Sequence, residues 1–362
     1  MGKQQYARPV DREKLKDYSS IVFGALGGAM TAAMVHLGDR LGLFREMASG
    51  EPVSSQELAE RTGLHERWLR EWLYQQGSAG VLEYAGDDHF SLSAEGSAVL
   101  AQESHPAFGA GMFSSFPQTI GVTTRLPEAF RTGVGLPYDA FGPEGAHGIE
   151  RGFAPWFRSL LVPVALPRLD GVVPALEAGA RVADIGCGGG VALLEMARAY
   201  PNSEFHGYDI SAHALERAET NRTESGVENA EFHDATQDPL PGDASFHFVT
   251  TFDVLHDMTD PASAMRSVRA ALRDDGAWLI CDIKARDGYE ENVARNPMVA
   301  LMYGMSVVSC MSSALSEPGG AGLGTLGLHE ELAREMTKDA GFSSFETLDF
   351  DHPVNAFYLA RP

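Results

Sequence analysis

A glycine-rich turn and an acidic residue about 20 positions after it point most directly to chemistry in this 362-residue chain. The segment 181–190 reads as a buried strand with Asp184 near its end, followed by Gly186, Gly188 and Gly190. A second short strand, 204–208, leads into Asp209. In nucleotide-binding strand–helix–strand units, a carboxylate at this spacing reads a ribose diol, and glycines let the backbone approach the ligand. We therefore expect the C-terminal half to bind an adenosine-type cofactor.

The glycine spacing indicates which cofactor this is. A dinucleotide fingerprint has glycines at its first, third and sixth positions, so that a helix N-terminus meets a pyrophosphate. Here the sixth position is Val191, and Asp184 beside the turn would repel phosphate but attract a cation. S-adenosylmethionine has no phosphate and carries a sulfonium and an ammonium group. The segment resembles the first motif of class I S-adenosylmethionine-dependent methyltransferases.

Later segments are similar to the same family. Residues 231–235 read as a third strand, with Asp234 placed as the family's contact to the adenine amino group, and 246–251 read as a buried fourth strand. The resemblance implies that the cofactor is held by residues at the ends of these strands: Asp184, Gly186, Cys187, Gly188, Asp209, Ile210, Asp234, Ala235, Thr251 and Phe252.

The order of elements predicts the fold class. After the fourth strand come a helix at 262–272, a turn at 273–276 and a fifth strand at 277–283. Alternating strands and helices indicate a doubly wound parallel sheet. A last helix from His329 to about 340 and strands at 342–348 and 355–359 would complete the seven-stranded sheet typical of the family. We expect an α/β, Rossmann-like methyltransferase domain preceded by a mainly helical winged-helix domain.

The N-terminal half reads as helix, turn, helix and hairpin. Apolar residues recur at helical spacing over 18–44, interrupted by three glycines, and Ser54 to Glu57 resembles a helix cap. A helix at 66–76 precedes strands at 81–84 and 89–92, which flank a turn at 85–88. This arrangement is a winged helix.

Charge opposes DNA binding by the winged helix. Residues 1–105 hold ten Lys and Arg against fifteen Asp and Glu, a net of −5, and the whole chain has a formal charge of −22. Proteins that bind nucleic acid need a basic face to neutralise phosphates. We therefore expect no nucleic-acid partner and a role for this domain in packing and dimerisation.

Cysteine use and hydropathy favour a cytoplasmic protein. Cys187, Cys281 and Cys310 have neither paired nor metal-type spacing, which suits a reducing compartment and predicts no metal site. The N-terminus is polar, and no uninterrupted apolar run reaches about 18 residues. We expect no signal peptide and no membrane partner.

An N-terminal winged helix, a helical linker and a C-terminal methyltransferase domain together resemble small-molecule O-methyltransferases and a bacterial group of winged-helix methyltransferases. Segments 126–133 and 138–142 are similar to the linker of that group. The resemblance implies a winged-helix and dimerisation domain at 1–105, a linker capping the active site at 106–178, and a cofactor-binding domain at 179–362 with an insertion or lid at 284–328. It also implies a homodimer.

His256 is the candidate general base. It follows the fourth strand, at the edge where ligands bind in such sheets, and an unperturbed imidazole titrates near pH 6.5. His256 and Asp257 resemble the His-Asp of the O-methyltransferase signature, although Met258 stands where that signature usually has Trp. A role in positioning or hydrogen bonding is the alternative.

Candidates for the substrate pocket come from the linker and the insertion. The linker contributes the aromatic side chains of Tyr138, Phe153, Trp156 and Phe157. The insertion contributes Met302 and Tyr303 from an apolar run, which is followed by a glycine-rich loop at 318–324. The start of the last helix contributes His329. Packing in a core or a dimer contact is the competing interpretation of each.

These observations predict methyl transfer from S-adenosylmethionine to a small-molecule acceptor, with oxygen as the expected target. Two alternatives stay open: N- or C-methylation without a histidine base, and a cofactor-sensing transcriptional regulator whose winged helix binds DNA. The identity of the acceptor does not follow from the sequence.

Overall fold

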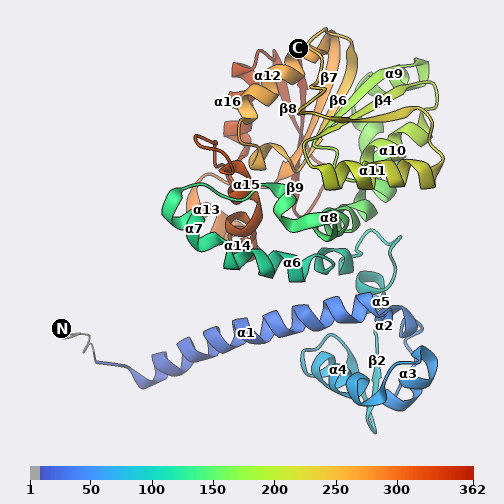
Figure 1. The fold of residues 1–362 in the computed structure, drawn as a ribbon, viewed down its shortest axis with the longest axis vertical. Helices are drawn as coiled ribbons and strands as arrows, with labels where there is room; N and C mark the ends of the chain where they lie inside the picture. The colour runs from blue at the N-terminus through green and yellow to red at the C-terminus, as the bar shows by residue number, and fades with distance from the viewer. Residues whose placement is uncertain (1–8) are drawn as a thin grey trace. The chain divides into compact units, whose positions relative to one another are not determined.

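A computed structural model describes residues 9–362, and these divide into two compact units. The first unit comprises the chain up to Glu103 together with Ala107–Phe116, and the second comprises Ser104–Pro106 and Pro117–Pro362. Figure 1 shows the elements of each unit.

The first unit is a helical domain with a small hairpin. Its elements in chain order are α1 (Arg12–Arg40), α2 (Leu43–Glu46), α3 (Ser55–Thr62), α4 (Glu66–Ser78), β1 (Glu83–Gly86), β2 (His89–Ser91), α5 (Ala94–Leu100) and η1 (Ala110–Phe113). Ser54 caps α3 in a capping box with Glu57, as the sequence predicts. The core of this unit includes Phe44, Leu58 and Trp72.

Two local predictions for this unit are wrong. The glycines at 24, 27 and 28 do not interrupt the first helix, because α1 runs unbroken over 29 residues. The first strand of the hairpin also lies two residues later than expected, at Glu83–Gly86, which shortens the turn to 87–88. Asp87 and Asp88 both have positive φ, 48° and 56°, which is the backbone geometry of the tight turns that suit a twisted hairpin.

The apolar surface of α1 is largely exposed. Phe23 is 71% exposed and Leu26 is 59% exposed. An 18-residue window of α1 reaches a mean hydropathy of 1.6, with 11% of it buried, so by length and composition the helix could cross a membrane. This differs from the expectation that no apolar segment is long enough to span a membrane. A single such helix is weak support for a membrane span, because helices of water-soluble proteins meet the same measure.

The second unit is built on a seven-stranded sheet in the order β5-β4-β3-β6-β7-β9-β8. Its strands are β3 (Arg181–Ile185), β4 (Glu204–Asp209), β5 (Ala230–Asp234), β6 (Phe246–Phe252), β7 (Leu272–Ile283), β8 (Ser344–Leu348) and β9 (Asn355–Arg361). β3 to β7 pair in parallel, and β9 is antiparallel to both β7 and β8. The predicted seven-stranded, Rossmann-like fold class is confirmed.

Apolar residues on both sides of the sheet hold the helices. Neighbours along β3 enter different cores, since Val182 belongs to the cluster with α10 and Ala183 to the cluster with α12 and α16. The same alternation separates Phe248 from Val249. Helices therefore cover both faces, as Figure 1 shows. The helices that follow strands are α10 (Val191–Ala199), α11 (Ala212–Ser225), η6 (Leu255–Asp257), α12 (Pro261–Ala271) and α16 (Glu330–Asp339).

The predicted turn at 273–276 is instead part of β7. The strand begins at Leu272, which pairs with Phe246, and the pairing then jumps to Phe248 with Ala277. Residues 273–276 are thus an irregularity within one strand rather than a separate turn. Polar residues in this stretch are exposed, which explains why the sequence reads as a turn.

Two helical segments complete the second unit. The segment before the sheet holds α6 (Phe116–Gly121), η2 (Val122–Thr124), α7 (Leu126–Thr132), η3 (Tyr138–Phe141), α8 (Gly142–Trp156), η4 (Phe157–Ala165), η5 (Leu166–Arg168) and α9 (Val172–Ala178). The insertion between β7 and α16 holds α13 (Gly288–Arg295), α14 (Val299–Met305), η7 (Ser306–Cys310) and α15 (Met311–Ala314).

Candidate active site

The glycine turn after β3 has the backbone shape that a close ligand requires. Gly186, Gly188 and Gly190 all have positive φ, between 54° and 72°, which side chains other than glycine rarely adopt. A Cβ on Gly186 would lie 2.3 Å from Val254, and one on Gly190 would lie 2.4 Å from Phe232. A Cβ on Gly188 would meet no atom within 4 Å. The middle of the turn therefore borders open space, and its two flanks are packed.

Asp209 closes this turn from the end of β4. Its Oδ2 accepts a hydrogen bond of 2.8 Å from the Gly188 N–H, and its Oδ1 accepts one of 2.8 Å from the Ser211 N–H. Burial raises the pKa of Asp209, while these backbone hydrogen bonds lower it, and the net shift is upward. The carboxylate is thereby fixed beside the open middle of the turn, as a group that reads a ribose must be.

Asp184 lies inside the sheet. It is 1% exposed and accepts a hydrogen bond of 2.7 Å from the Thr250 hydroxyl. Burial, only partly offset by that hydrogen bond, raises the pKa of Asp184 to about 7. A buried carboxyl in this state favours a nearby cation.

The other predicted cofactor residues lie around the same edge of the sheet. Ile210 is 69% exposed next to Asp209, and Asp234 is exposed at the end of β5, where its Oδ1 accepts from the Thr236 N–H and hydroxyl. The Ala235 N–H donates to the Asp209 carbonyl at 2.9 Å, which ties the two strand ends together. The apolar side chain of Ile210 and the carboxylate of Asp234 therefore lie on the same edge of the sheet.

Three predicted cofactor residues have their side chains engaged elsewhere. The Thr251 hydroxyl accepts from Trp278 at 3.2 Å, and the Phe252 ring lies 5.0 Å from that of Phe157. Burial raises the pKa of the Cys187 thiol well above its usual range, so this cysteine is unreactive and packs as a small buried side chain beneath the turn. Any contribution of these residues comes from the backbone or from packing.

The linker before the sheet supports the glycine turn, and these supporting contacts were not predicted from the sequence. Glu150 of α8 is 9% exposed and receives a hydrogen bond of 2.6 Å from Arg217 and one of 3.0 Å from Asn221. Asn221 also donates to the Gly189 carbonyl at 2.8 Å. The Ser211 hydroxyl donates to Asp139 of η3. No sequence pattern pairs residues some 70 positions apart, and only the fold brings them together.

His256 is buried beside a carboxylate. It lies on η6, directly after β6, and is 2% exposed. Its Nδ1 is 2.6 Å from Oδ1 of Asp282, which is 1% exposed on β7. The Cys310 thiol lies within hydrogen-bonding reach of the ring. Because Nδ1 donates to the carboxylate, Nε2 is the ring atom left for the Cys310 thiol or for a substrate that displaces it.

The protonation of His256 differs from the sequence expectation. Burial lowers the pKa of His256, but the charge of Asp282 and the hydrogen bond to it outweigh burial, so the pKa lies well above its usual value. The assumption of an unperturbed imidazole is therefore wrong. Asp282 therefore makes removal of the proton from His256 harder than it is for a free imidazole.

Further carboxyls gather around this pair. Burial, reinforced by Asp282, raises the pKa of Asp253 to about 7, and burial raises that of Asp257 to about 7 as well. Asp253 has the strained φ of 52° and accepts from Asn355. Oδ2 of Asp282 has no hydrogen-bond partner among residues 9–362. Together with Asp184 and Asp209, these groups form an acidic site in which a bound cation, such as the sulfonium or ammonium group of S-adenosylmethionine, would favour the ionised carboxylates.

The candidates for the substrate pocket divide into two groups. Tyr138 lies near the residues that surround His256. It is hydrogen-bonded to Ser309, and Asp257 and Cys310 lie close to its phenol. Burial raises the pKa of the Tyr138 phenol well above its usual range, so it stays neutral and can donate. Tyr138 thus connects the linker, η6 and η7.

The remaining candidates are engaged in packing. The Trp156 ring lies 5.3 Å from that of Phe357 and 6.1 Å from that of Phe252. The Phe157 ring packs edge-on against Trp156, and Phe153 packs against Phe157. Met302 lies in a small apolar cluster, and Tyr303 is exposed with its ring 6.2 Å from Tyr289. His329 caps α16, accepting from the Leu332 N–H.

The glycine-rich loop at 318–324 is anchored to the site. The Ala321 N–H donates to the Thr259 carbonyl at 2.8 Å, and the Gly324 N–H donates to the His256 carbonyl at 2.9 Å. Movement of this loop would therefore act on the backbone of η6.

Two protein families match the chain. The family described as "Methyltransferase domain" matches residues 176–341, and the "Rv2258c-like winged HTH domain" matches residues 29–102. A ubiquinone biosynthesis O-methyltransferase of Paracidovorax citrulli is 32% identical over 119 residues, which cover 32% of this chain and 48% of that protein. The chain thus spans about half the length of this relative.

Solved structures share the whole architecture at low identity. Human N-acetylserotonin methyltransferase has a TM-score of 0.66 at 18% identity, covering 100% of this chain and 99% of its own. An O-methyltransferase family protein from Burkholderia thailandensis has a TM-score of 0.67 at 16% identity, covering 96% of this chain and 97% of its own. These likenesses show the fold. The chain therefore carries a methyltransferase domain preceded by a winged helix-turn-helix domain, in a fold that it shares with S-adenosylmethionine-dependent methyltransferases.

Proposed function

We propose that the protein transfers a methyl group from S-adenosylmethionine to an oxygen atom of a small molecule, with His256 as the general base. The observation that carries this proposal is the buried His256–Asp282 pair, with a separation of 2.6 Å, in the same unit and at the same strand edge as Gly188 and Asp209. A carboxylate that fixes the imidazole tautomer is the usual partner of a histidine base.

The residues divide the work as follows. Bound S-adenosylmethionine supplies an electrophilic methyl group on its sulfonium sulfur. The 186–190 turn and Asp209 orient the nucleoside, and Ile210 and Asp234 contact the adenine. His256 must first release its Nε2 proton to solvent. Nε2 then accepts the proton of the acceptor hydroxyl, and Asp282 stabilises the imidazolium that results. Orientation in a site without bulk water supplies much of the rate, on the order of 7–11 kcal/mol at best.

A small acceptor accords with the relatives. The first relative is named for an O-methylation step of ubiquinone biosynthesis, and one structural neighbour is named for N-acetylserotonin. Tyr138, whose neutral phenol lies near Asp257 and Cys310, is our candidate for contact with this acceptor. The site offers one histidine and several acids, so an acceptor with a hydroxyl proton to release is the best match.

The winged helix supports an enzyme rather than a DNA-binding regulator. Both arginines of α4, the helix that would enter a DNA groove, are paired with glutamates one turn away: Arg67 with Glu71 at 2.6 Å, and Arg70 with Glu66 at 2.8 Å. Paired charges leave little basic surface for phosphates. We infer instead that the exposed apolar face of α1 is covered by a second copy of the chain in a cytoplasmic homodimer.

Replacement of His256 by Gln tests the catalytic role. We expect a loss of about 10²–10⁴-fold in transfer of labelled methyl groups to a panel of phenols and alcohols. Calorimetry with S-adenosylhomocysteine should show unchanged cofactor binding, and His65→Gln on the exposed surface of the first unit is the control. An unchanged rate would remove the base assignment, and transfer to amines or carbon acids alone would establish the N- or C-methylation alternative.

A further inference from the structure

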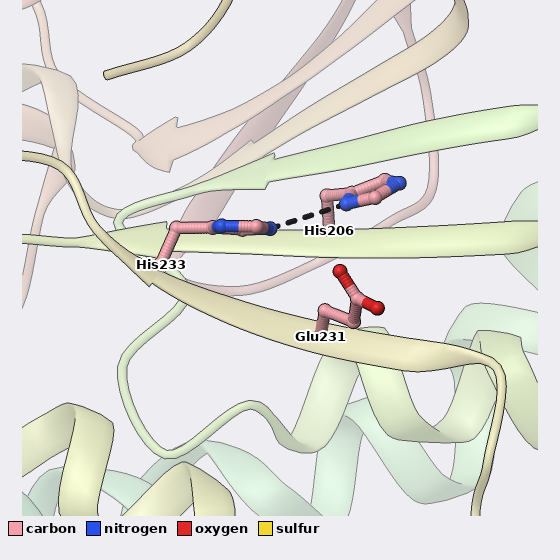
Figure 2. Close-up of side chains that lie close together, drawn as sticks. All are labelled: His206, Glu231 and His233. Carbon is pink, nitrogen blue, oxygen red and sulfur yellow. Dashed lines mark hydrogen bonds between the residues drawn. The ribbon is translucent and has the colours of Figure 1, made fainter. Parts of the chain in front are cut away.

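A second cluster of chemically active side chains lies on the outer face of strands β4 and β5. His206 is on β4, and Glu231 and His233 are on β5, two positions apart, so that they project to the same face. The register pairs His206 with Glu231 and Tyr208 with His233. Figure 2 shows the three side chains converging on one another, with the two imidazoles joined by a hydrogen bond.

The distances match those of metal ligands. Nδ1 of His206 is 3.1 Å from Nε2 of His233, and one ligand atom from each of the three residues lies within 4.8 Å of the others. Ligand atoms that bind one Zn²⁺ at about 2.0–2.1 Å in a tetrahedron stand roughly 3.3 Å apart. The imidazoles already have this separation, and the Glu231 carboxylate, on an exposed side chain, has freedom to close the remainder.

A supporting carboxylate already orients one of the rings. Nδ1 of His233 is 2.8 Å from Oδ2 of Asp238, so Nδ1–H donates to the carboxylate and the lone pair of Nε2 faces His206. This arrangement of carboxylate, histidine and ligand position is the one that supports zinc-bound histidines in proteins. Stacking of the Tyr208 ring on His233, with centroids 4.7 Å apart, further restrains the imidazole.

The fold explains why these polar groups lie on a sheet face. The connection from β5 to β6, residues 235–245, contains no helix, so no helix packs here against the outer strands. Glu231 and Asp238 are exposed, and His206 and His233 are half-buried. An ion from solvent can therefore reach the cluster.

One neighbour opposes a cation. Nε of Arg181 is 3.4 Å from Nε2 of His206, although its guanidinium also donates to the Ser245 hydroxyl at 2.7 Å. When Nδ1 of His206 binds a metal, its proton must move to Nε2, which then no longer accepts from Arg181. The Ser245 hydroxyl remains as the partner of the arginine. Arg181 should thus weaken the site without abolishing it.

We propose that His206, Glu231 and His233 form a binding site for a divalent transition-metal ion of the zinc class. Two imidazoles and one carboxylate favour such an ion over Mg²⁺ or Ca²⁺, which prefer oxygen ligands. The fourth position is open to water. The site is separate from the methyl-transfer chemistry, and it does not depend on the proposed function.

The proposed ion would stiffen a turn that belongs to the cofactor edge. Asp238, the partner of His233, also donates its N–H to the Asp234 carbonyl at 2.8 Å. Asp234 immediately follows His233 and is the proposed adenine contact. Metal binding therefore clamps β4, β5 and the 234–238 turn together.

Titration of the untagged, metal-free protein with ZnCl₂ tests the site. Calorimetry should show one equivalent bound to the full chain, and CoCl₂ should give the visible absorption bands of a tetrahedral Co²⁺ centre. His206→Gln or His233→Gln should weaken Zn²⁺ binding at least tenfold, and Asp238→Asn about 10–100-fold. His213→Gln, outside the cluster, is the matched control.

The outcomes separate a real site from adventitious binding. Circular dichroism of each variant shows whether it is folded, and Glu231→Gln, at an exposed position, provides a variant that leaves both imidazoles in place. Arg181→Met should bind Zn²⁺ more tightly than the natural chain. The proposal is overturned if no stoichiometric Zn²⁺ binds, or if binding is the same in the His206 and His233 variants as in the control.

Discussion

Nδ1 of His256 and Oδ1 of Asp282 lie 2.6 Å apart in a region where both side chains are almost completely buried. Asp282 lies on β7, and His256 lies on η6, the short helical turn that follows the neighbouring parallel strand β6. The pair is therefore built into the fold rather than into a flexible loop. Its protonation state determines how the active site should respond to pH.

The pH dependence of turnover should change when Asp282 is replaced by Asn. A base works only when deprotonated, so kcat/KM should rise with pH through the pKa of His256, which Asp282 holds above 6.5 against the opposing effect of burial. Without the carboxylate, burial still lowers the pKa of His256 and only the smaller effect of Cys310 opposes it, so the rising limb should move to lower pH. The maximal rate should also fall, because the tautomer is no longer fixed.

Rate–pH profiles of both proteins from pH 5 to about 9.5 measure this shift. Asp274→Asn, at a fully exposed carboxyl on the same strand, is the control. If the limb stays in place while the rate falls, Asp282 acts by packing and not by setting the charge of His256.

Asp209 should dominate cofactor affinity. Its carboxylate is held by the N–H groups of Gly188 and Ser211 and faces the open part of the turn. A hydrogen bond to a charged group is worth about 1.5–3 kcal/mol, so Asp209→Ala should weaken binding of S-adenosylhomocysteine about 10–100-fold. Calorimetry measures this loss. Glu204→Gln, at the exposed start of the same strand, should bind normally.

The two glycines of the turn should respond differently to alanine. Gly188→Ala places a Cβ in open space, so only its φ of 54° costs stability, about 1 kcal/mol, but the methyl group enters the volume proposed for the cofactor. Gly190→Ala places a Cβ 2.4 Å from the Phe232 ring and should destabilise the fold considerably more.

Thermal unfolding and cofactor calorimetry separate these effects. Gly188→Ala should melt close to the natural protein and bind S-adenosylhomocysteine poorly, whereas Gly190→Ala should melt at a distinctly lower temperature. Equal loss of stability in both would show that the turn is not open at Gly188.

The sequence was sufficient for the parts of this structure that depend on local pattern. The capping box at Ser54 and the strand that ends in Asp209 follow from spacing and periodicity, and they appear within a residue or two of the predicted positions. The seven-stranded sheet was implied by the family resemblance and is also present. Such signals lie within a few residues of one another and survive without knowledge of tertiary contacts.

What the sequence did not supply are partners that only the fold brings together. Asp282 stands 26 positions from His256, and Glu150 stands 67 positions from Arg217. His206 and His233 are 27 positions apart, and no metal-type spacing connects them. The raised pKa of His256 was not predicted for the same reason, since a pKa depends on burial and on neighbours that lie on other strands.

The exposed face of α1 should mediate self-association. Phe23, Leu26 and Met30 are 71%, 59% and 53% exposed, and apolar side chains this numerous on one helix are normally covered by a partner. Phe23→Asp combined with Leu26→Asp should convert a dimer into a monomer, because burying two carboxylates without partners costs several kcal/mol. Light scattering after gel filtration measures the mass, and Tyr84→Asp, at an exposed apolar residue of the hairpin, is the control. Flotation with liposomes distinguishes the alternative: a natural protein that is monomeric in buffer yet binds vesicles would show that α1 contacts lipid instead of a second copy.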